Sequence, residues 1–347
     1  MNSPLLFVQY NTQELDQRKI EDPTKEQLKA IRAVLDGIES FYQKKIDILS
    51  LQEVSLFKKE NIAHIQSELQ LGGYHHFFHP AKTGVNALKK QDGSYHTDPQ
   101  DVAAREASDP VNFGIFPHQY SSGIFYQKGP NQLTLLKTEV IDDVKWKEFN
   151  PSINLDQFRD HRGDYLNDDI PLFDKGLIIY TFQYHEKLFQ LIQVHTTPAF
   201  HFHQEKTMNY QRNFDQLRFL EWILTGETDL IPQLKDKIAT PNLKLPLVAC
   251  GDWNVDFRQV DDKRKKGAKV IKRILERFQT FKDDPHLYSL VGKNQDKLLI
   301  DYIICSKEEM LQDIQIINPS HKNLGVELTS HLKCASDHFP LLLLFSP

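Results

Sequence analysis

The chain has 347 residues, of which 40% are hydrophobic and 26% are charged, so we expect a soluble globular protein with a substantial core. Its formal net charge of -5 excludes a protein that coats nucleic acid through overall basicity, although a local basic groove would be compatible with it. The cysteines Cys250, Cys305 and Cys334 are too few and too widely spaced for a disulfide framework or a cysteine zinc site.

The first residues, Met1 to Val8, have no basic region, and their apolar run is too short for a secretory signal peptide. No stretch elsewhere in the sequence is long enough to cross a bilayer. We therefore expect no transmembrane segment and a cytoplasmic location, or one that the sequence does not reveal. The sequence identifies no protein partner.

Segments typical of strands and helices alternate along the chain. Leu5 to Val8 and Ile46 to Leu51 are short apolar runs that predict buried strands. Between them, Thr24-Lys25-Glu26-Gln27 is a capping-box pattern followed by apolar residues with helical spacing. Two further amphipathic helices are predicted, over Tyr210 to Leu224 and over Val270 to Phe278. The later predicted strands are Gly123 to Tyr126, Gln132 to Leu136, Leu177 to Phe182, Leu188 to Val194, Leu245 to Cys250, Leu298 to Cys305, Ile314 to Ile317 and Phe339 to Phe345.

No internal repeat, low-complexity tract or Pro/Gly/Ser linker divides the chain, so we predict a single domain over residues 1–347. Two segments, 72–120 and 142–175, have the mixed composition of insertions, and long irregular segments of this kind are often binding loops. Strands and helices that alternate without one clean period favour an α/β sandwich over a barrel.

Six short polar clusters lie where a predicted strand begins or ends. Their residues are Asn11, Glu53, His195, Asp252 with Asn254, Asp301, and Asp337 with His338. Strand ends on one edge of a sheet converge in space, so these side chains could form a single pocket although they span most of the chain. Carboxylate and carboxamide oxygens suit Mg²⁺ or Mn²⁺ and are poor zinc ligands without more nitrogen or sulfur.

In this order, the six clusters resemble the motifs of the endonuclease/exonuclease/phosphatase superfamily, which includes DNase I-like nucleases, abasic-site endonucleases, neutral sphingomyelinases, inositol polyphosphate 5-phosphatases and deadenylases. The resemblance runs from Asn11 to His338 and rests on the order of the motifs, because Gln-Glu-Val or Gly-Asp-x-Asn alone is common. It implies a four-layer α/β sandwich in which two central mixed sheets pack face to face with helices outside. It also implies hydrolysis of a phosphodiester by in-line attack of an activated water, with Mg²⁺ as cofactor and Mn²⁺ as an alternative.

The resemblance also implies roles for the metal and phosphate ligands. Glu53 would bind the metal directly, with Asn11 and Asp337 near it. His338 would lie against the scissile phosphate, and Asp301 would accept a hydrogen bond from its far ring nitrogen. A metal ion together with imidazolium and amide donors would lower the barrier to attack on an anionic phosphodiester.

The remaining roles concern the attacking water and the other phosphate oxygens. Asp252 would orient or deprotonate the water, and Asn254 would hold it or donate to a phosphoryl oxygen. His195 would donate to another phosphate oxygen. The resemblance leaves open whether Asp252 or His338 is the general base. Tyr120 is the nearest candidate for a further residue that positions the phosphate.

Several of these residues also have an ordinary structural explanation. Gly-Asp-x-Asn at 251–254 is a good turn, and Thr196-Thr197-Pro198 is an ordinary exit from a strand. Gln13 stands where the family often has a second polar ligand, so the donor set of this chain differs there. The histidines at positions 75, 76 and 79 could suggest a second metal site, but strand alternation puts His76 on the other face.

The substrate is less well defined than the reaction. Nucleic acid is our first prediction, and a phosphoinositide, sphingomyelin or another small phosphoester is the alternative. A lipid substrate would call for an exposed membrane-contact loop, for which Phe113-Gly114-Ile115-Phe116-Pro117 is a candidate, although the same run could belong to the core. A catalytically dead binding scaffold is a third hypothesis.

Overall fold

Two mixed β-sheets form the centre of the molecule. The computed structural model describes residues 3–127, 133–160, 162–199, 207–227, 234, 237–238, 240–262, 265–281, 287–292, 294–306, 310–320 and 326–347. Gln132, at which a strand was predicted to begin, and residue 161 of the second predicted insertion lie outside these residues.

The larger sheet has six strands in the order β12-β13-β1-β2-β4-β3. Their bounds are Leu5–Leu15 for β1, Ile48–Val54 for β2, Tyr74–His79 for β3, Ser121–Gln127 for β4, Leu311–Ile316 for β12 and Leu341–Phe345 for β13. The smaller sheet has five strands in the order β11-β8-β7-β6-β5. Its strands are Leu133–Ile141 for β5, Leu177–Tyr184 for β6, Lys187–Val194 for β7, Leu247–Asp252 for β8 and Asp301–Cys305 for β11.

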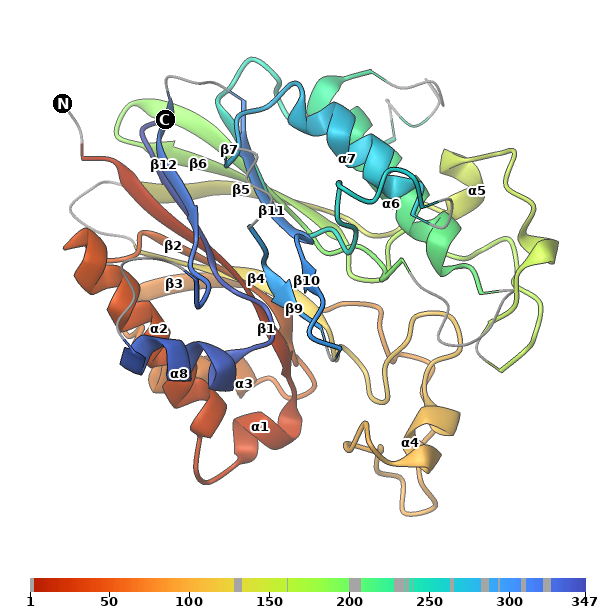
Figure 1. Cartoon of the computed structure of the whole chain (residues 1–347). Coiled ribbons are helices and arrows are strands. Elements are labelled where there is room, and N and C mark those ends of the chain that lie inside the picture. The colour runs from red at the N-terminus through yellow and green to blue at the C-terminus, as the bar shows by residue number, and fades with distance from the viewer. Residues whose placement is uncertain are drawn as a thin grey trace.

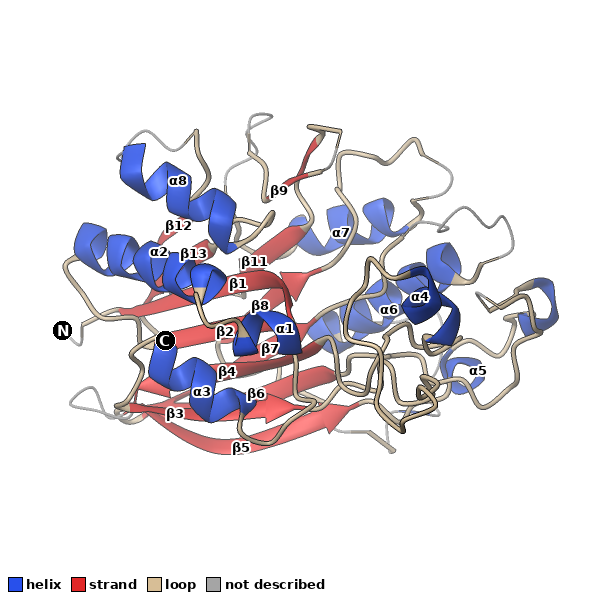
Figure 2. Cartoon of the chain, turned by 90° about the horizontal axis from the view of Figure 1, so that it is seen from below, coloured by secondary structure: helices blue, strands red, loops and turns tan. Residues whose placement is uncertain are grey.

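Helices cover the outer face of each sheet (Figures 1 and 2). On the larger sheet lie α1 (Gln17–Glu21), α2 (Glu26–Tyr42), α3 (Asn61–Glu68) and α8 (Val326–Ala335), and on the smaller sheet lie α6 (Asn209–Thr225) and α7 (Gly267–Leu275). The loops beyond the strand ends carry α4 (Val102–Ala107), α5 (Trp146–Phe149), the short η1 helix (Leu155–Gln157) and the small β9 (Leu290–Val291) and β10 (Lys297–Leu298) hairpin. The predicted four-layer sandwich with two mixed central sheets is confirmed. Among the described residues, no helix is long and apolar enough to cross a membrane.

Each sheet contains one parallel pair of strands, and these two pairs determine where polar side chains meet. β1 pairs in parallel with β2, and β7 pairs in parallel with β8. Parallel neighbours need a long crossover, which α2 supplies in the first pair and α6 in the second. The carboxyl ends of all four strands therefore face the same end of the sandwich.

A buried polar network joins the two sheets next to these strand ends. The side-chain amide of Gln52 in β2 donates to the Val194 carbonyl at 3.0 Å, and its oxygen accepts from the Asp252 backbone N–H at 2.8 Å. Gln193 in β7 donates in the other direction, to the Leu51 carbonyl at 3.2 Å. Buried polar groups are costly unless they are paired, so these bonds fix the position of one sheet relative to the other.

Three local predictions need correction. The helix predicted after Thr24 forms, but its capping box does not: Lys25 is the N-cap in the left-handed region, and the Gln27 amide donates to the Thr12 carbonyl at 2.6 Å. The predicted strand from Leu298 to Cys305 is interrupted because the Leu299 N–H donates to Asp256 at 3.0 Å instead of to a neighbouring strand. Residues 74–79 of the predicted first insertion form the edge strand β3, so the part outside the sheet begins after His79.

Candidate active site

The candidate site lies where the parallel strands of both sheets end. Asn11 and Glu53 come from β1 and β2, and their partner Asp252 is the last residue of β8. The Asn11 amide nitrogen lies 3.1 Å from Glu53 Oε1 and 3.1 Å from Asp252 Oδ2, and it donates to both. One carboxamide therefore links two carboxylates that are separated by almost 200 residues in sequence and belong to different sheets.

The backbone around these residues is held in a strained conformation. Gln13, Glu14, Glu53 and Asn254 have φ angles of 48°, 51°, 61° and 57°, in the left-handed region that side chains other than glycine seldom adopt. Such strain persists only where local contacts impose it, and the Glu14 N–H donates to Glu53 Oε2 at 2.8 Å. The Asn254 N–H donates to Asp252 Oδ1 at 2.8 Å, so Gly-Asp-x-Asn forms a turn and also presents a carboxylate to the site.

His338 and Asp301 form a buried ion pair opposite Asp252. Asp301 is the first residue of β11 and lies directly opposite Asp252 in the strand register. His338 Nδ1 donates to Asp301 Oδ2 at 2.7 Å, and His338 Nε2 lies 4.0 Å from Asp252 Oδ2. Burial alone would lower the pKa of His338, but Asp301, with help from Asp252 and Asp337, outweighs it and holds that pKa well above its usual value. His338 is therefore an imidazolium at neutral pH.

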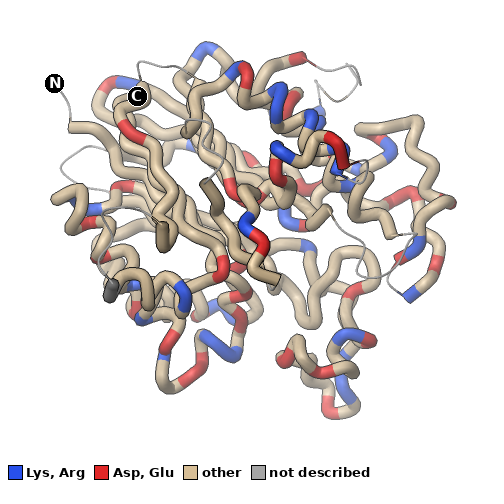
Figure 3. The backbone as a smooth tube through the Cα atoms, viewed as in Figure 1, with Lys and Arg blue, Asp and Glu red and all other residues tan. Residues whose placement is uncertain are grey.

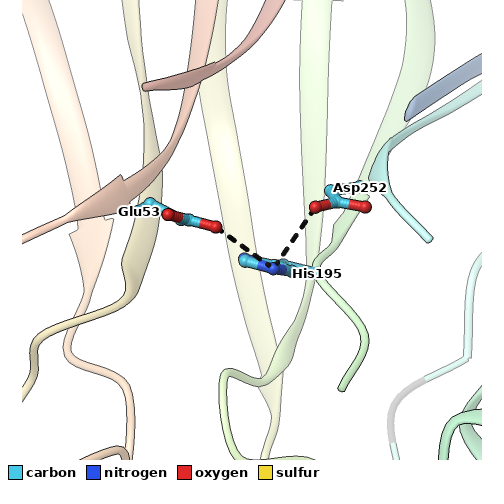
Figure 4. A group of neighbouring side chains, drawn as sticks. All are labelled: Glu53, His195 and Asp252. Carbon is cyan, nitrogen blue, oxygen red and sulfur yellow. Dashed lines mark ion pairs between the residues drawn. The ribbon is translucent and has the colours of Figure 1, made fainter. Parts of the chain in front are cut away.

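His195 follows β7 and, unlike His338, is uncharged. Its Nε2 lies between the two carboxylates (Figure 4), 3.6 Å from Asp252 Oδ2 and 3.9 Å from Glu53 Oε1. Both distances are too long for hydrogen bonds. Burial, together with the positive charges of Lys175 and His338, holds the pKa of His195 well below its usual value, so the ring is neutral. The buried Nδ1 of His195 has no hydrogen-bond partner within the described part of the chain.

The segment that carries Asp337 and His338 is held against β1. The Ser336 hydroxyl donates to the Asn11 carbonyl at 2.9 Å, and the Asp337 N–H donates to the Gln13 side chain at 3.2 Å. The Gln13 side chain is thus occupied in fixing this loop. Asp337 is partly exposed, and its Oδ1 lies 3.8 Å from His338 Nε2.

Tyr120 comes immediately before β4 and is nearly buried beside the carboxylates. Its hydroxyl donates to Glu14 Oε1 at 2.8 Å. Burial and the negative charges of Glu14 and Glu53 raise its pKa well above the ordinary value, so the hydroxyl keeps its proton. Asn254 is engaged in a similar way, because its amide donates to the Thr196 carbonyl at 2.9 Å.

Sequence reasoning missed Glu14 and Gln52. Glu14 follows an unremarkable polar run, and only the reversal of the backbone at residues 13 and 14 turns its N–H toward Glu53. Gln52 directly precedes Glu53, and this position was the one sequence signal that could have drawn attention to it. Its role in joining the two sheets is visible only in the tertiary structure. The histidines of β3 lie elsewhere: His79 pairs with Asp142 at 3.1 Å and belongs to neither candidate metal group of the described residues.

No protein-family model matches the chain, and no curated protein matches its sequence. Solved structures do match over nearly the whole chain. An endonuclease/exonuclease/phosphatase from Bacteroides vulgatus has a TM-score of 0.54 and 12% identity, with 99% of each chain covered.

The chain has the endonuclease/exonuclease/phosphatase fold. An endonuclease/exonuclease/phosphatase family protein from Leptotrichia buccalis agrees with a TM-score of 0.53 and 12% identity, covering 99% of this chain and 100% of the other. A humanized D. rerio TDP2 gives a TM-score of 0.52 and 13% identity over 100% of both chains. The resemblance seen in the six motifs is thus confirmed for the fold.

On this endonuclease/exonuclease/phosphatase fold, the described residues include two groups of side chains that could hold a metal ion. Glu53, His195 and Asp252 form one, and Asp252, Asp301 and His338 form the other. The surroundings favour a cation: burial and the charge of Asp301 raise the pKa of Asp252 well above its usual value, and burial raises that of Asp337. Asp301 Oδ1 is also buried, and no described residue gives it a hydrogen bond. The first group fits better, because a protonated His338 cannot be a ligand.

Proposed function

We propose that the protein is a metal-dependent phosphoesterase that hydrolyses a phosphodiester, with Mg²⁺ as cofactor and nucleic acid as substrate. The observation that carries this proposal is the buried cluster of Glu53, Asp252 and Asp301 beside the imidazolium of His338. Carboxylates crowded together out of water repel each other, and a divalent cation relieves that repulsion. The fold gives independent support, because known proteins of this fold include phosphoesterases.

The metal would be held by Glu53, with Asn11 and Asp337 near it, and when bound it would polarise a phosphoryl oxygen. His338 carries a proton on Nε2 that can be donated to a phosphoryl oxygen, which makes it a donor and not the base. Asp252 then remains as the acceptor of the proton from the attacking water. Neutral His195 can donate from only one ring nitrogen, toward another phosphate oxygen.

The burial of the apolar run at 113–117 favours nucleic acid over lipid as the substrate. Ile115 and Phe116 are buried with Ala104 in a small core of their own and cannot reach a membrane. A crystal structure of D. rerio TDP2, which matches with a TM-score of 0.50 and 12% identity, is complexed with single strand DNA product. Acidic and basic residues are interspersed over the outer helices and loops (Figure 3), so nucleic acid would be held by local contacts near the site.

One observation favours the alternative substrate class. Val85, Leu88 and Val102 in the first insertion are exposed by 47%, 54% and 68%, and apolar side chains of this kind can dip into a lipid surface. A phosphoinositide or sphingomyelin therefore remains the second candidate.

A substrate panel tests the proposal. Purified protein is incubated with single-stranded RNA, plasmid DNA, sphingomyelin or inositol phosphates, with Mg²⁺ or with EDTA. We expect Mg²⁺-dependent cleavage of nucleic acid that is lost in Asp252→Asn. Cleavage of the lipid alone would select the second candidate. No turnover of any substrate with Mg²⁺ or Mn²⁺ would support a binding scaffold and refute the enzyme.

A further inference from the structure

Three lysines lie in a row on the outer surface of α7. Lys266 immediately precedes the helix, and Lys269 and Lys272 follow at intervals of three residues, so that neighbours in the row lie on the same side of it. All three side chains are exposed, and we call them the lysine row. They carry three positive charges over about 9 Å of helix axis. α7 itself contains no acidic residue, which makes it an exception to the mixed charge of the outer helices in Figure 3.

The charges of the lysine row are not balanced by acidic neighbours. Among the described residues, no carboxylate forms an ion pair with any of the three side chains. The far end of α7 differs, because Arg273 pairs with Glu221 at 2.5 Å. Just beyond the helix, Arg277 pairs with Glu227 at 2.7 Å. Like charges at the spacing of the lysine row repel each other, and a bound anion would relieve that repulsion.

α6 places the start of the lysine row beside the candidate active site. A pocket of about 240 Å³ adjoins the site, and its lining includes Glu53, His195, Phe113, Lys175 and Asn209. Asn209 is the first residue of α6. Two residues further along this helix, the side-chain oxygen of Gln211 lies 3.4 Å from Lys266 Nζ. The lysine row therefore begins within one helical turn of the residue that lines the pocket.

Close packing fixes α7 relative to the site. An added Cβ on Gly267 would lie 2.9 Å from the side-chain oxygen of Asn213 in α6, so the two helices touch at this point. The amide of Asn213 donates to the Trp253 carbonyl at 3.1 Å, directly after Asp252. The two ion pairs further along continue the same alignment, so α7 runs parallel to α6. The lysine row thus leads away from the site from a fixed starting point.

A polyanion fits the lysine row better than a membrane surface does. α7 buries the apolar side chains of Val270, Ile271 and Ile274 in the core. None of the large exposed apolar side chains in the described part of the chain belongs to α7. Helices that lie on a membrane keep an apolar face for the lipid, and α7 has none left for it. Exposed cations without apolar neighbours are suited to the successive phosphates of a nucleic-acid strand.

We propose that the lysine row binds the phosphate backbone of a nucleic-acid strand beyond the scissile phosphate, where the strand leaves the metal site along α7. The proposal rests on the proposed function, because it takes the phosphate at Glu53 to belong to the same strand. It makes the preferred substrate a polymer of several nucleotides and not a single nucleotide.

Binding of a fluorescein-labelled single-stranded DNA of about 20 nucleotides tests the lysine row without cleavage. Fluorescence anisotropy is measured in EDTA from about 0.05 to 0.4 M NaCl, for the wild-type protein and for Lys266→Gln/Lys269→Gln/Lys272→Gln. Each neutralised phosphate of a single strand adds about 0.7 to the steepness of log K against log salt concentration. Three lost contacts should therefore flatten the slope by about 2 and weaken binding at about 0.1 M NaCl by about 100-fold.

Two further variants serve as controls. Lys45→Gln/Lys187→Gln/Lys244→Gln removes the same charge from exposed positions that precede or begin β2, β7 and β8, at the end of the sandwich opposite the site. This variant should keep the wild-type slope. Lys266→Arg/Lys269→Arg/Lys272→Arg keeps the charge of the lysine row and should also keep the slope.

Three outcomes would overturn the proposal. The first is an unchanged slope in the glutamine variant of the lysine row, and the second is an equal flattening in the control at the opposite end. The third uses vesicles of phosphatidylcholine and phosphatidylserine: a lysine row needed for vesicle binding but not for DNA binding would be a membrane contact. DNA binding that depends on the lysine row, in a protein that cleaves no nucleic acid, would refute the proposed function and leave the lysine row standing, so the two failures are distinguishable.

Discussion

Replacing Asp301 by asparagine isolates the charge that keeps His338 protonated. Asp301 accepts the 2.7 Å bond from His338 Nδ1, and both side chains are buried. Asparagine keeps the shape but loses the charge that does most to oppose burial, so the pKa of His338 should fall. At pH 7 the variant loses one charged donor to the phosphoryl oxygen, which typically costs about 100- to 1000-fold in kcat.

The sign of the pH dependence follows from the direction of the shift. A raised pKa keeps His338 charged until the pH climbs through that value, so wild-type activity should fall on the alkaline side. In Asp301→Asn the alkaline fall should move to lower pH, and the loss of kcat should shrink as the pH is lowered. Rates of phosphodiester hydrolysis from pH 5 to pH 10 measure this, with the exposed Asp98→Asn as a matched control.

Folding stability gives a second readout for the same variant. Removing one partner of a buried ion pair usually costs about 3–5 kcal/mol, because a buried charge is left alone. Here His338 can release its proton, and the charge of Asp301 is one cause of the raised pKa of Asp252, so its removal relieves repulsion. We expect the free energy of unfolding at pH 7 to change by less than about 1 kcal/mol. For activity, a loss of kcat in Asp301→Asn that is equal at every pH would refute the assignment of that loss to the charge of His338.

Three further substitutions test other parts of the site. Mg²⁺ should raise the thermal midpoint of the wild-type protein and of the control variant Glu186→Gln by a few degrees. It should not raise the midpoint of Glu53→Gln, and an equal rise in all three proteins would contradict Glu53 as a metal ligand. Gln52→Leu leaves the Asp252 N–H and the Val194 carbonyl unpaired and should lower the free energy of unfolding in urea by about 3 kcal/mol; no change would mean that the sheets are held by other contacts. At Gly251, φ is 140° and an added Cβ would lie 1.9 Å from the Val194 carbonyl oxygen, so Gly251→Ala should lower the thermal midpoint markedly, and a native midpoint would show that β7 can move aside.

Most sheet strands were predictable because their apolar runs are short and end in polar residues. β7 and β8 are clear in the sequence for this reason, and so is the position of Asp252 at the end of β8. β3 was placed inside the first predicted insertion, because none of its residues is fully buried and the run lacks the apolar character of the central strands. The capping box at Thr24 failed because Gln27 is drawn into tertiary contacts with Thr12, which no local pattern reveals.

The convergence of the polar strand ends was predictable, whereas their charge states were not. The sequence could not show that His338 is an imidazolium and His195 is neutral. Asp301 lies 2.7 Å from the ring of His338, whereas burial and the charge of Lys175 lower the pKa of His195. The pocket beside Glu53 could not be predicted from the sequence either. Its walls come from Phe113 and Lys175, which lie in segments without a repeating pattern and meet only through the fold.

The most direct test of the central claim is the rate of hydrolysis of bis-p-nitrophenyl phosphate, a phosphodiester without base or lipid, by the wild-type protein and by Glu53→Gln and His338→Ala. We predict turnover that requires Mg²⁺ or Mn²⁺, stops with EDTA, and falls by at least about 100-fold in each variant. No metal-dependent turnover, or turnover at the wild-type rate in both variants, would contradict the assignment of this site as a metal-dependent phosphodiesterase centre.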